Sequence, residues 1–510
     1  MRRVSPPPQM TRLRWRGVGW LVGYAVALGL AHALVIAPAF GYMGFENVPP
    51  NILVAIVLVP TYVVCARRLP VSWERPSAVI YWMLFLLVVA PVHVIVVFTS
   101  ELTAELWLMV GAVAAAFWLL GFIYSVPLPS PHRRRPSPRV YWLAFSLLWL
   151  ALVGTVISYY GLQFRFVALS EIYEVRDTYR DSFEYVPRVA RYAITWLGNA
   201  IAPIAIGRGL VTRRWLWVVL GVVTELFLVS ITGFKQMLFA SALVVAVVVL
   251  VRATDVKRVG ERVVVLATTG IVLVTMLDFL RGATSLTTIA VRRLILTAGI
   301  NTKYYFDFFT DHPFVYMGHG LFKRWVEYSY HLPPPFLIGE VYFGDANLSA
   351  NANIWADAYA NFGLVGVFGY TAVLAVALLF VDTVAQGVTR GLAVAGLAQS
   401  AFSLSNTALP TVFLTHGMLL AIVLIAFMPT ESSSGEDGWR WGRLFVRRRS
   451  TADVQDAVAS SDQATGRPET SRPDPASRPD PVSSPDTVSS PDTARPHTAS
   501  RPNTGSEQDP

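Results

Sequence analysis

Residues 77–99 read SAVIYWMLFLLVVAPVHVIVVFT, an apolar run in which His93 is the only acidic or basic side chain. A helix needs about 20 mostly apolar residues to cross the roughly 30 Å hydrocarbon layer of a bilayer. This stretch therefore predicts a transmembrane helix.

Blocks of the same kind recur through most of the chain. The predicted spans lie near residues 17–40, 48–65, 77–99, 106–126, 140–161, 192–211, 215–232, 236–251, 263–281, 362–381, 391–407 and 411–428. They define a multi-pass membrane domain over 17–430. We expect an all-α, polytopic integral membrane protein of about twelve transmembrane helices. The first block is not expected to be a cleavable signal peptide, because its apolar run is too long and no small-residue cleavage site follows.

The composition excludes several classes of protein. The 510-residue chain is 54% hydrophobic and 15% charged, whereas an ordinary soluble domain carries about 25% charged residues. The formal net charge of +9 does not indicate nucleic-acid binding, because the basic residues gather in short connectors between apolar blocks. A single cysteine, Cys65, excludes an internal disulfide and a multi-cysteine zinc site.

The connectors alternate in charge along the chain. Basic clusters occur within residues 1–16, 67–75, 133–139, 208–214 and 252–262, and the short loops between them carry Glu46, Glu101 and Glu105. Arg and Lys accumulate in short cytoplasmic loops. We therefore expect a plasma (inner) membrane protein with both termini in the cytoplasm and a basic cytoplasmic N-terminus over 1–16. Two long segments, 162–191 and 282–361, are then outer loops.

The C-terminal residues 431–510 are mostly Ser, Thr, Pro, Asp and Arg. Ser-Arg-Pro-Asp-Pro occurs at 471–475 and 477–481, and Ser-Ser-Pro-Asp-Thr at 483–487 and 489–493. Such a composition cannot bury enough apolar surface to fold, so this segment is predicted to be a disordered cytoplasmic tail.

The first outer segment is predicted to contain a helix. Ile172, Val175 and Tyr179 would share one face of that helix. Ser170 is a suitable N-cap, and Pro187 would end the helix.

Ionisable residues inside spans are costly, so each is a candidate for function. They are Glu225, Asp278, His32, His93 and His416. The alternative is ordinary packing with hydrogen bonds, which is commoner for buried histidines. His416 is the histidine of most interest, because it falls near the outer half of its span.

Basic residues on the outer side run against the orientation rule. They include Arg281, Arg292, Arg293 and Lys235. If 281–293 were one helix, Arg281 and Arg292 would lie about three turns apart on one face. Guanidinium groups bind phosphate bidentately and keep their charge, so the cluster predicts an anion site. The alternative is solvated charge or contact with lipid headgroups.

The second outer segment also contains groups that could accept a proton from a sugar hydroxyl. These are Asp307, Asp311, His319, Glu327, His331, Glu340, Asp345 and Asp357. No pair has a diagnostic spacing. The sequence has no Asp-x-Asp metal motif, no Walker loop and no His-Glu-x-x-His, so neither a metal nor a cofactor is expected.

Residues 351–370 read NANIWADAYANFGLVGVFGY. This stretch resembles the segment with which O-antigen polymerases (Wzy-type), or oligosaccharide repeat unit polymerases, re-enter the membrane after their large outer loop. The matching residues are Asn353, Tyr359, Asn361, Phe362, Gly363 and Gly366. A Thr-Gly-x-Lys break at 232–235 also looks similar. Gly363 and Gly366 would let the helix pack closely on its neighbours, whereas Asn353 and Asp357 would face a cavity.

The resemblance implies a polymerase on the outer face of the plasma membrane, similar in fold to the all-helical GT-C glycosyltransferases. It would join oligosaccharide repeat units carried on undecaprenyl pyrophosphate during synthesis of O-antigen, capsule or exopolysaccharide. Its partners would be the lipid-linked oligosaccharide, the lipid bilayer, and a flippase and chain-length regulator of the same pathway, with no nucleic acid.

The same resemblance suggests roles for individual residues. Arg281, Arg292, Arg293 and Lys235 would stabilise the departing pyrophosphate. Glu340, Asp357 or His319 would deprotonate the acceptor hydroxyl.

Other functions stay open. Within the enzymes, a glycan ligase or a polyprenyl-phosphate-dependent GT-C glycosyltransferase would need similar groups. A lipid-linked oligosaccharide transporter would suit twelve spans, but the two halves of this chain look unlike, whereas transporters usually show internal symmetry. A scaffold or sensor that recruits partners through its repetitive tail is a further alternative.

Overall fold

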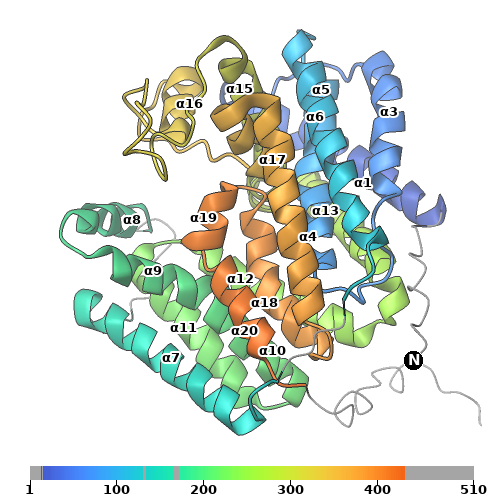
Figure 1. Cartoon of the computed structure of the whole chain (residues 1–510). Helices are drawn as coiled ribbons and strands as arrows, with labels where there is room; N and C mark the ends of the chain where they lie inside the picture. Colours follow the sequence, from blue (N-terminus) through green and yellow to red (C-terminus); the bar gives the residue numbers. More distant parts are fainter. Residues whose placement is uncertain (1–12, 14, 130–133, 163, 165–171, 431–510) are drawn as a thin grey trace, which may run out of the picture. The chain divides into compact units, whose positions relative to one another are not determined.

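We describe a computed structural model of the chain over residues 13, 15–129, 134–162, 164 and 172–430, and a few side chains within these ranges, including those of Ile172 and Lys235, lie outside the description. The elements of the described residues are all helices, so the predicted all-α fold is confirmed (Figure 1). Ser170 and the predicted tail, 431–510, lie outside the described residues.

The helices follow one another with short connectors. The first are α1 (Trp15–Ala31), α2 (Ala37–Phe40), α3 (Ile52–Ala66), α4 (Ala78–Leu84), α5 (Ala90–Val97), α6 (Ala104–Leu120) and α7 (Pro138–Tyr160). The next are α8 (Ile172–Asp181), α9 (Arg188–Trp196), α10 (Ala202–Thr212), α11 (Trp215–Thr232), α12 (Lys235–Ala253) and α13 (Val259–Arg281). The last are α14 (Ser285–Thr287), α15 (Thr297–Asp311), α16 (Pro334–Phe343), α17 (Ile354–Val384), α18 (Arg390–Ser403), α19 (Leu409–Leu414) and α20 (Met418–Phe427).

Several of these helices continue into one another through π-helical turns. The turns are η1 (His32–Ile36), η3 (Phe85–Val89), η6 (Leu197–Ile201) and η8 (Thr288–Leu296). Because of them, α1 and α2, α4 and α5, and α9 and α10 each act as one long element.

Eight helical segments of the described chain are long and apolar enough to cross a membrane. They are Trp15–Met43, Ala78–Val97, Ala104–Ser125, Pro138–Tyr160, Arg188–Thr212, Trp215–Thr232, Val256–Arg281 and Ile354–Val384. Each coincides with a predicted span, and α3, α12, α18 and α19–α20 fall on the other four. These eight candidate spans are consistent with a multi-pass membrane protein, and the full count of twelve stays a prediction.

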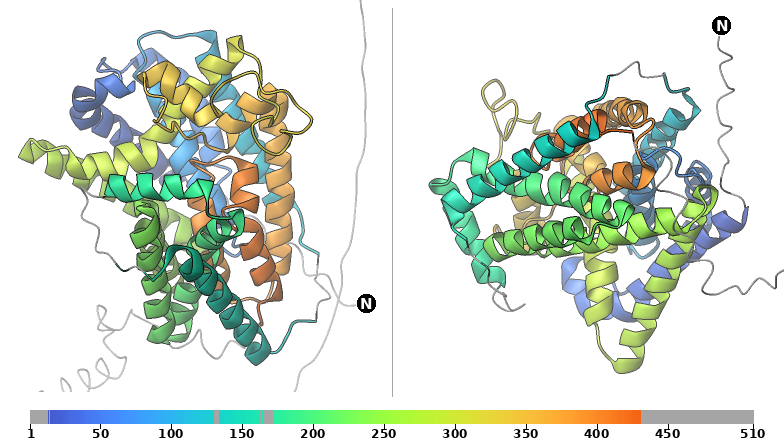
Figure 2. Two further views of the ribbon diagram at one scale, coloured as in Figure 1. Left: turned by 90° about the vertical axis from the view of Figure 1, so that its left-hand side faces the viewer. Right: turned by 90° about the horizontal axis from the view of Figure 1, so that it is seen from below.

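Helix α18 lies at the centre of the packing. It packs against α10 and α12 on one side and against α4 on the other (Figures 1 and 2). Every residue from Gly391 to Ala401 is buried, and most are small. Small residues let helix backbones approach closely: a Cβ added to Gly207 of α10 would come 2.4 Å from the Cβ of Ala395.

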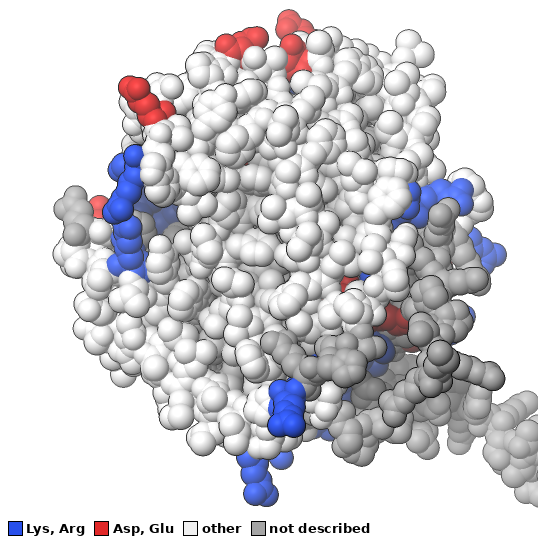
Figure 3. Space-filling view, viewed as in Figure 1, with Lys and Arg blue, Asp and Glu red and all other residues white. Residues whose placement is uncertain are grey.

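The outer surfaces of several helices are apolar. Val365 of α17 is 81% exposed and Leu280 of α13 is 73% exposed. One face of the molecule is almost free of charge across its centre, with acidic and basic side chains gathered towards the edges (Figure 3). Such a surface suits contact with lipid tails, which solvate apolar side chains but not charges.

The predicted outer loop 282–361 contains more regular structure than expected. Residues 285–311 form a continuous helical stretch, and α15 packs against α5, α6 and α17. Its buried side chains include Tyr305, Phe306 and Phe309. The sequence hid this packing because polar residues such as Asn301, itself buried, and Lys303 interrupt the apolar run.

The first outer segment contains the predicted helix. It is α8, which ends at Asp181 and is followed by the short 3₁₀ turn Ser182–Glu184. Pro187 therefore does not end α8, as predicted, but directly precedes α9. Tyr179 is buried as expected, and its ring lies 5.5 Å from that of Phe234.

The motif in 351–370 forms a helix with a sharp break. Asn353 caps α17: its side-chain oxygen accepts hydrogen bonds from the N–H groups of Trp355 and Ala356. Phe362 and Gly363 have non-helical backbone angles, and Gly363 has φ +60° and ψ −146°, a region that essentially only glycine occupies. A Cβ on Gly366 would lie 2.2 Å from the carbonyl oxygen of Ala358, so the close approach at this glycine is to the part of α17 before its break and not, as expected, to a neighbouring helix.

We predict that Gly363→Ala destabilises the protein by about 1–3 kcal/mol, because alanine would be strained at this φ and ψ. Its Cβ would also lie 2.8 Å from the ring of Phe314. Gly369→Ala is the matched control, since it lies on the same helix and its Cβ would meet nothing within 4 Å. The measurement is the apparent midpoint of thermal unfolding in detergent, and equal midpoints for the two variants would contradict the assignment.

Candidate functional site

A cavity of about 650 Å³ lies where the two predicted outer segments meet the helix ends. We call it the outer cavity. It is lined by Arg176, Thr195, Asn199, Gly233, Phe234, Met237, Arg293, His319, Pro333, Pro335, Phe336, Ser349, Asn351, Ala352, Asp357, Asn406, Thr407, Ala408, Thr411 and His416. Among the elements that supply these residues, α8 and α16 lie at the left of Figure 1, and α19 and α17 lie nearer its centre. Its volume is within the range of about 300–1,000 Å³ typical of small-molecule sites.

Three predicted site residues line this cavity together. Arg293 belongs to η8, His319 to the connector between α15 and α16, and Asp357 to the first turn of α17. A cation, an imidazole and a carboxylate from different parts of the chain are thus present in one cavity.

Asp357 is the buried acidic group of the outer cavity, with 7% of its surface exposed. The cap of Asn353 fixes the turn on which Asp357 stands, and the Asn353 amide also donates to Thr302 Oγ1 at 2.6 Å. The backbone oxygen of Asp357 accepts a hydrogen bond from Asn361 Nδ2 at 2.8 Å. Asn353 therefore supports the helix and does not line the cavity.

His319 is exposed, and its ring lies 5.7 Å from the ring of Tyr328. Desolvation by the surrounding protein lowers the pKa of its imidazole below the ordinary value. The neutral form, which can accept a proton, therefore predominates at neutral pH.

Two arginines supply positive charge to the cavity. Arg293 is exposed, and the guanidinium carbon of Arg176 lies 5.6 Å from the ring centre of Phe234. Phe234 follows Gly233, which ends α11 with φ +64°. The Thr-Gly-x-Lys break thus forms part of the cavity wall. Lys235 begins α12 beside it, but its side chain lies outside the described residues.

The other predicted cations lie elsewhere. Arg281 is exposed at the end of α13, where Gly282 with φ +61° stops the helix. Arg292 is buried, with its guanidinium carbon 4.1 Å from the ring centre of Phe40. The stretch 281–293 is therefore not one helix, and neither arginine is among the residues that line the outer cavity.

Glu340 also lies apart from the outer cavity lining. Its carboxylate is 2.8 Å from His331 Nε2, on the partly exposed surface of α16. Lys303 forms an ion pair with Glu46 at 2.9 Å. Burial alone would raise the pKa of Glu46, but hydrogen bonds from Ser100 and the Lys303 ammonium lower it below the ordinary value.

Most ionisable residues inside the predicted spans have packing roles. Asp278 accepts a hydrogen bond from the N–H of Thr287 at 2.6 Å, and His93 Nδ1 lies 2.8 Å from the carbonyl oxygen of Val89. Glu225 is different, since neither carboxyl oxygen has a hydrogen-bond partner among the described residues. A Cβ on Gly198 would lie 3.5 Å from Glu225 Oε2, next to the cavity-lining Asn199.

Sequence reasoning missed several lining residues, including Arg176, Asn199 and Asn406. Arg176 lies on the predicted helix of the first outer segment, but nothing in the sequence links that helix to 282–361. His416 was singled out, and its Nδ1 is buried without a hydrogen-bond partner in the described part of the chain. Within the same part, no group of three or more His, Cys, Asp or Glu residues could hold a metal ion.

A comparison with models of known protein families gives no match, and comparisons with curated proteins and with solved structures give none either. The resemblance of 351–370 and the function that it implies therefore stay predictions.

Single cysteines test which side of the membrane the outer cavity faces. The native Cys65 is buried, so the background of labelling is expected to be low. In right-side-out vesicles, we predict that a membrane-impermeant thiol reagent labels Arg293→Cys directly. It should label Arg214→Cys, at the other end of the helices, only after permeabilisation. The reverse pattern would show that the predicted orientation is inverted.

Proposed function

We propose that this chain is a membrane glycosyltransferase that joins undecaprenyl-pyrophosphate-linked oligosaccharide repeat units on the outer face of the plasma membrane. Twelve spans, a GT-C-like arrangement and cytoplasmic termini belong to this proposal. The observation that supports it best is the outer cavity, which combines Arg293, His319 and Asp357 at the end of the membrane helices.

The groups in the cavity match the needs of this reaction. The bond between the anomeric carbon of the growing glycan and the pyrophosphate breaks, and a bond to a hydroxyl of the next repeat unit forms. The proton of that hydroxyl passes to Asp357 or His319. The departing lipid pyrophosphate gains negative charge, which Arg293 and Arg176 would stabilise.

The remaining lining suits a sugar substrate. Phe234, Phe336, Pro333 and Pro335 offer apolar surfaces for sugar rings, and the asparagines at 199, 351 and 406 offer amide groups for hydroxyls. Small-molecule sites commonly combine apolar walls with a few convergent polar groups.

Two related enzymes could use the same cavity chemistry. A glycan ligase would transfer a finished polymer to an acceptor, and a polyprenyl-phosphate-dependent glycosyltransferase would transfer a single sugar. The length of the product separates the three. A defective polymerase leaves one-repeat products, whereas a defective ligase leaves polymer on the carrier.

The test uses cells in which this chain is the sole polymerase. We predict that Asp357→Asn reduces long-chain polysaccharide at least 100-fold, in line with losses of about 10²–10⁴ on removal of a catalytic acid or base. Arg293→Gln should also reduce it at least 100-fold, in line with losses of about 10²–10³ on removal of one group that stabilises the developing charge. Arg281→Gln is the matched control, since it removes one exposed outer charge that does not line the cavity.

Product length is measured on gels at equal amounts of inserted protein. Normal polymer from Asp357→Asn and Arg293→Gln would overturn the proposal. If lipid-linked units failed to reach the outer leaflet in the absence of this chain, a transporter would be the better assignment.

The pH dependence of the transfer tests His319. Its lowered pKa keeps the imidazole neutral down to a pH below its ordinary value of about 6.5. If His319 is the base, the initial rate should fall as the ring becomes protonated, and this fall should lie at a lower pH than for an imidazole with the ordinary pKa. His319→Gln should abolish that acid limb. An unchanged limb in this variant would exclude His319 as the base and favour Asp357.

A further inference from the structure

A second, larger cavity of about 990 Å³ lies among the connectors at another end of the helices. We call it the inner cavity. Its charged lining residues are Glu74, Arg75, Arg139, Arg208, Arg214, Asp382 and Arg390. Five arginines and two acidic residues therefore line one cavity.

The two cavities lie at opposite ends of α17. Asp357 lines the outer cavity and Asp382 lines the inner one. After the break at Gly363, the helix from Leu364 to Asp382 is about 27 Å long at 1.5 Å per residue, close to the roughly 30 Å thickness of the hydrocarbon layer. Helix α18 is buried between them from Gly391 to Ala401. The inner cavity is thus a separate site at the other membrane face.

Some charged side chains of the inner cavity already have hydrogen-bond partners within the protein, and others have none among the described residues. Asp382 accepts hydrogen bonds from the Ser77 backbone N–H at 3.0 Å and the Ser77 hydroxyl at 2.8 Å. Arg75 donates to the carbonyl oxygens of Ile123 and Val126. The side chains of Arg139, Arg214 and Arg390, by contrast, make no hydrogen bond or ion pair with any residue of the described chain.

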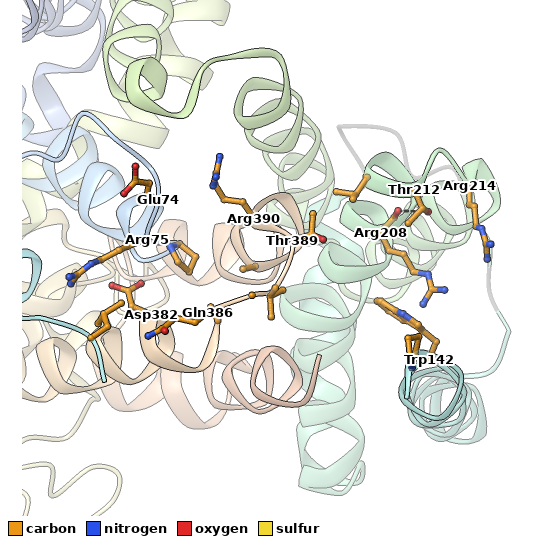
Figure 4. A pocket seen from close by; sticks show the side chains of 18 of the residues that line it. Glu74, Arg75, Trp142, Arg208, Thr212, Arg214, Asp382, Gln386, Thr389 and Arg390 are labelled. Carbon is orange, nitrogen blue, oxygen red and sulfur yellow. Dashed lines mark hydrogen bonds between the residues drawn. The ribbon is translucent and has the colours of Figure 1, made fainter. Parts of the chain in front are cut away.

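Arg208 is held in a fixed position in one wall. Its guanidinium carbon lies 3.4 Å from the ring centre of Trp142 and 4.4 Å from that of Trp217. Figure 4 shows Arg208 facing Trp142, with Thr212 and Arg214 near it, while Gln386, Thr389 and Arg390 come from another wall. Stacking on the two tryptophan rings holds this guanidinium in one orientation.

We propose that the inner cavity binds a phosphate group, supplied either by the headgroup of an anionic phospholipid or by a soluble phosphate compound. The planar guanidinium fork matches phosphate oxygens bidentately. Basic pockets between membrane helices on the cytoplasmic side suit anionic headgroups. This site is independent of the transfer proposed for the outer cavity.

The test uses the full chain purified in dodecyl maltoside, with two probes. The first probe is inorganic pyrophosphate, and its binding is measured as a shift in the thermal unfolding midpoint. The second probe is phosphatidylglycerol in mixed micelles, with phosphatidylcholine as the reference lipid. Its binding is measured by native mass spectrometry of the lipid that stays bound to the protein. We expect at least one probe to bind, and to bind at least 10-fold more weakly to the double variant Arg214→Gln with Arg390→Gln.

The matched control is Lys257→Gln with Arg258→Gln, which removes the same charge from an exposed connector that does not line the cavity. Binding of pyrophosphate alone would identify a soluble ligand, and binding of phosphatidylglycerol alone a headgroup. Binding of neither probe, or equal loss in both double variants, would overturn the proposal.

Discussion

The side chain of Asn361 ties together the parts of the chain on which the outer cavity depends. Its oxygen accepts a hydrogen bond from the N–H of Met317 at 2.7 Å, and its nitrogen donates to the backbone oxygen of Asp357 at 2.8 Å. Asn361 is buried, where an unpaired amide would be costly. These bonds join the connector that carries His319 to the turn that carries Asp357, just before Gly363 redirects the chain into its membrane helix.

The positions of the helices could be predicted because a segment that crosses a membrane must pair its backbone N–H and C=O groups within itself, as a helix does, and must carry mostly apolar side chains. The stretch 285–311 escaped this reasoning, since Arg292, Asn301 and Lys303 lower its hydropathy. All three are nevertheless accommodated by tertiary contacts: Arg292 stacks on Phe40, Asn301 donates to the Asn351 carbonyl, and Lys303 pairs with Glu46. Such contacts join residues far apart in sequence, so they cannot be predicted from a local sequence pattern.

The candidate site could be predicted only in part for a related reason. The sequence identifies candidate residues by their type, but whether a candidate lines the cavity depends on the direction in which its side chain points. Arg292 and Arg293 are neighbours, yet the first is buried against Phe40 and the second lines the outer cavity. Adjacent residues of a helix do not share a face, so the spacing of the arginines alone does not say which of the two lines the cavity. Arg176 joins the site from a separate outer segment.

The two cavities also bear on whether the chain transfers or transports. Alternating-access transporters keep one substrate site near the midplane and open it to one side at a time. Here a cavity with polar and charged lining residues lies at each end of α17. The middle of α18 is buried and consists mostly of residues with small side chains. A large polar substrate would have to displace α18 from its contacts with α4, α10 and α12 to pass between the ends. A transfer reaction at the outer cavity needs no such movement, because donor and acceptor would both reach it from the same membrane face.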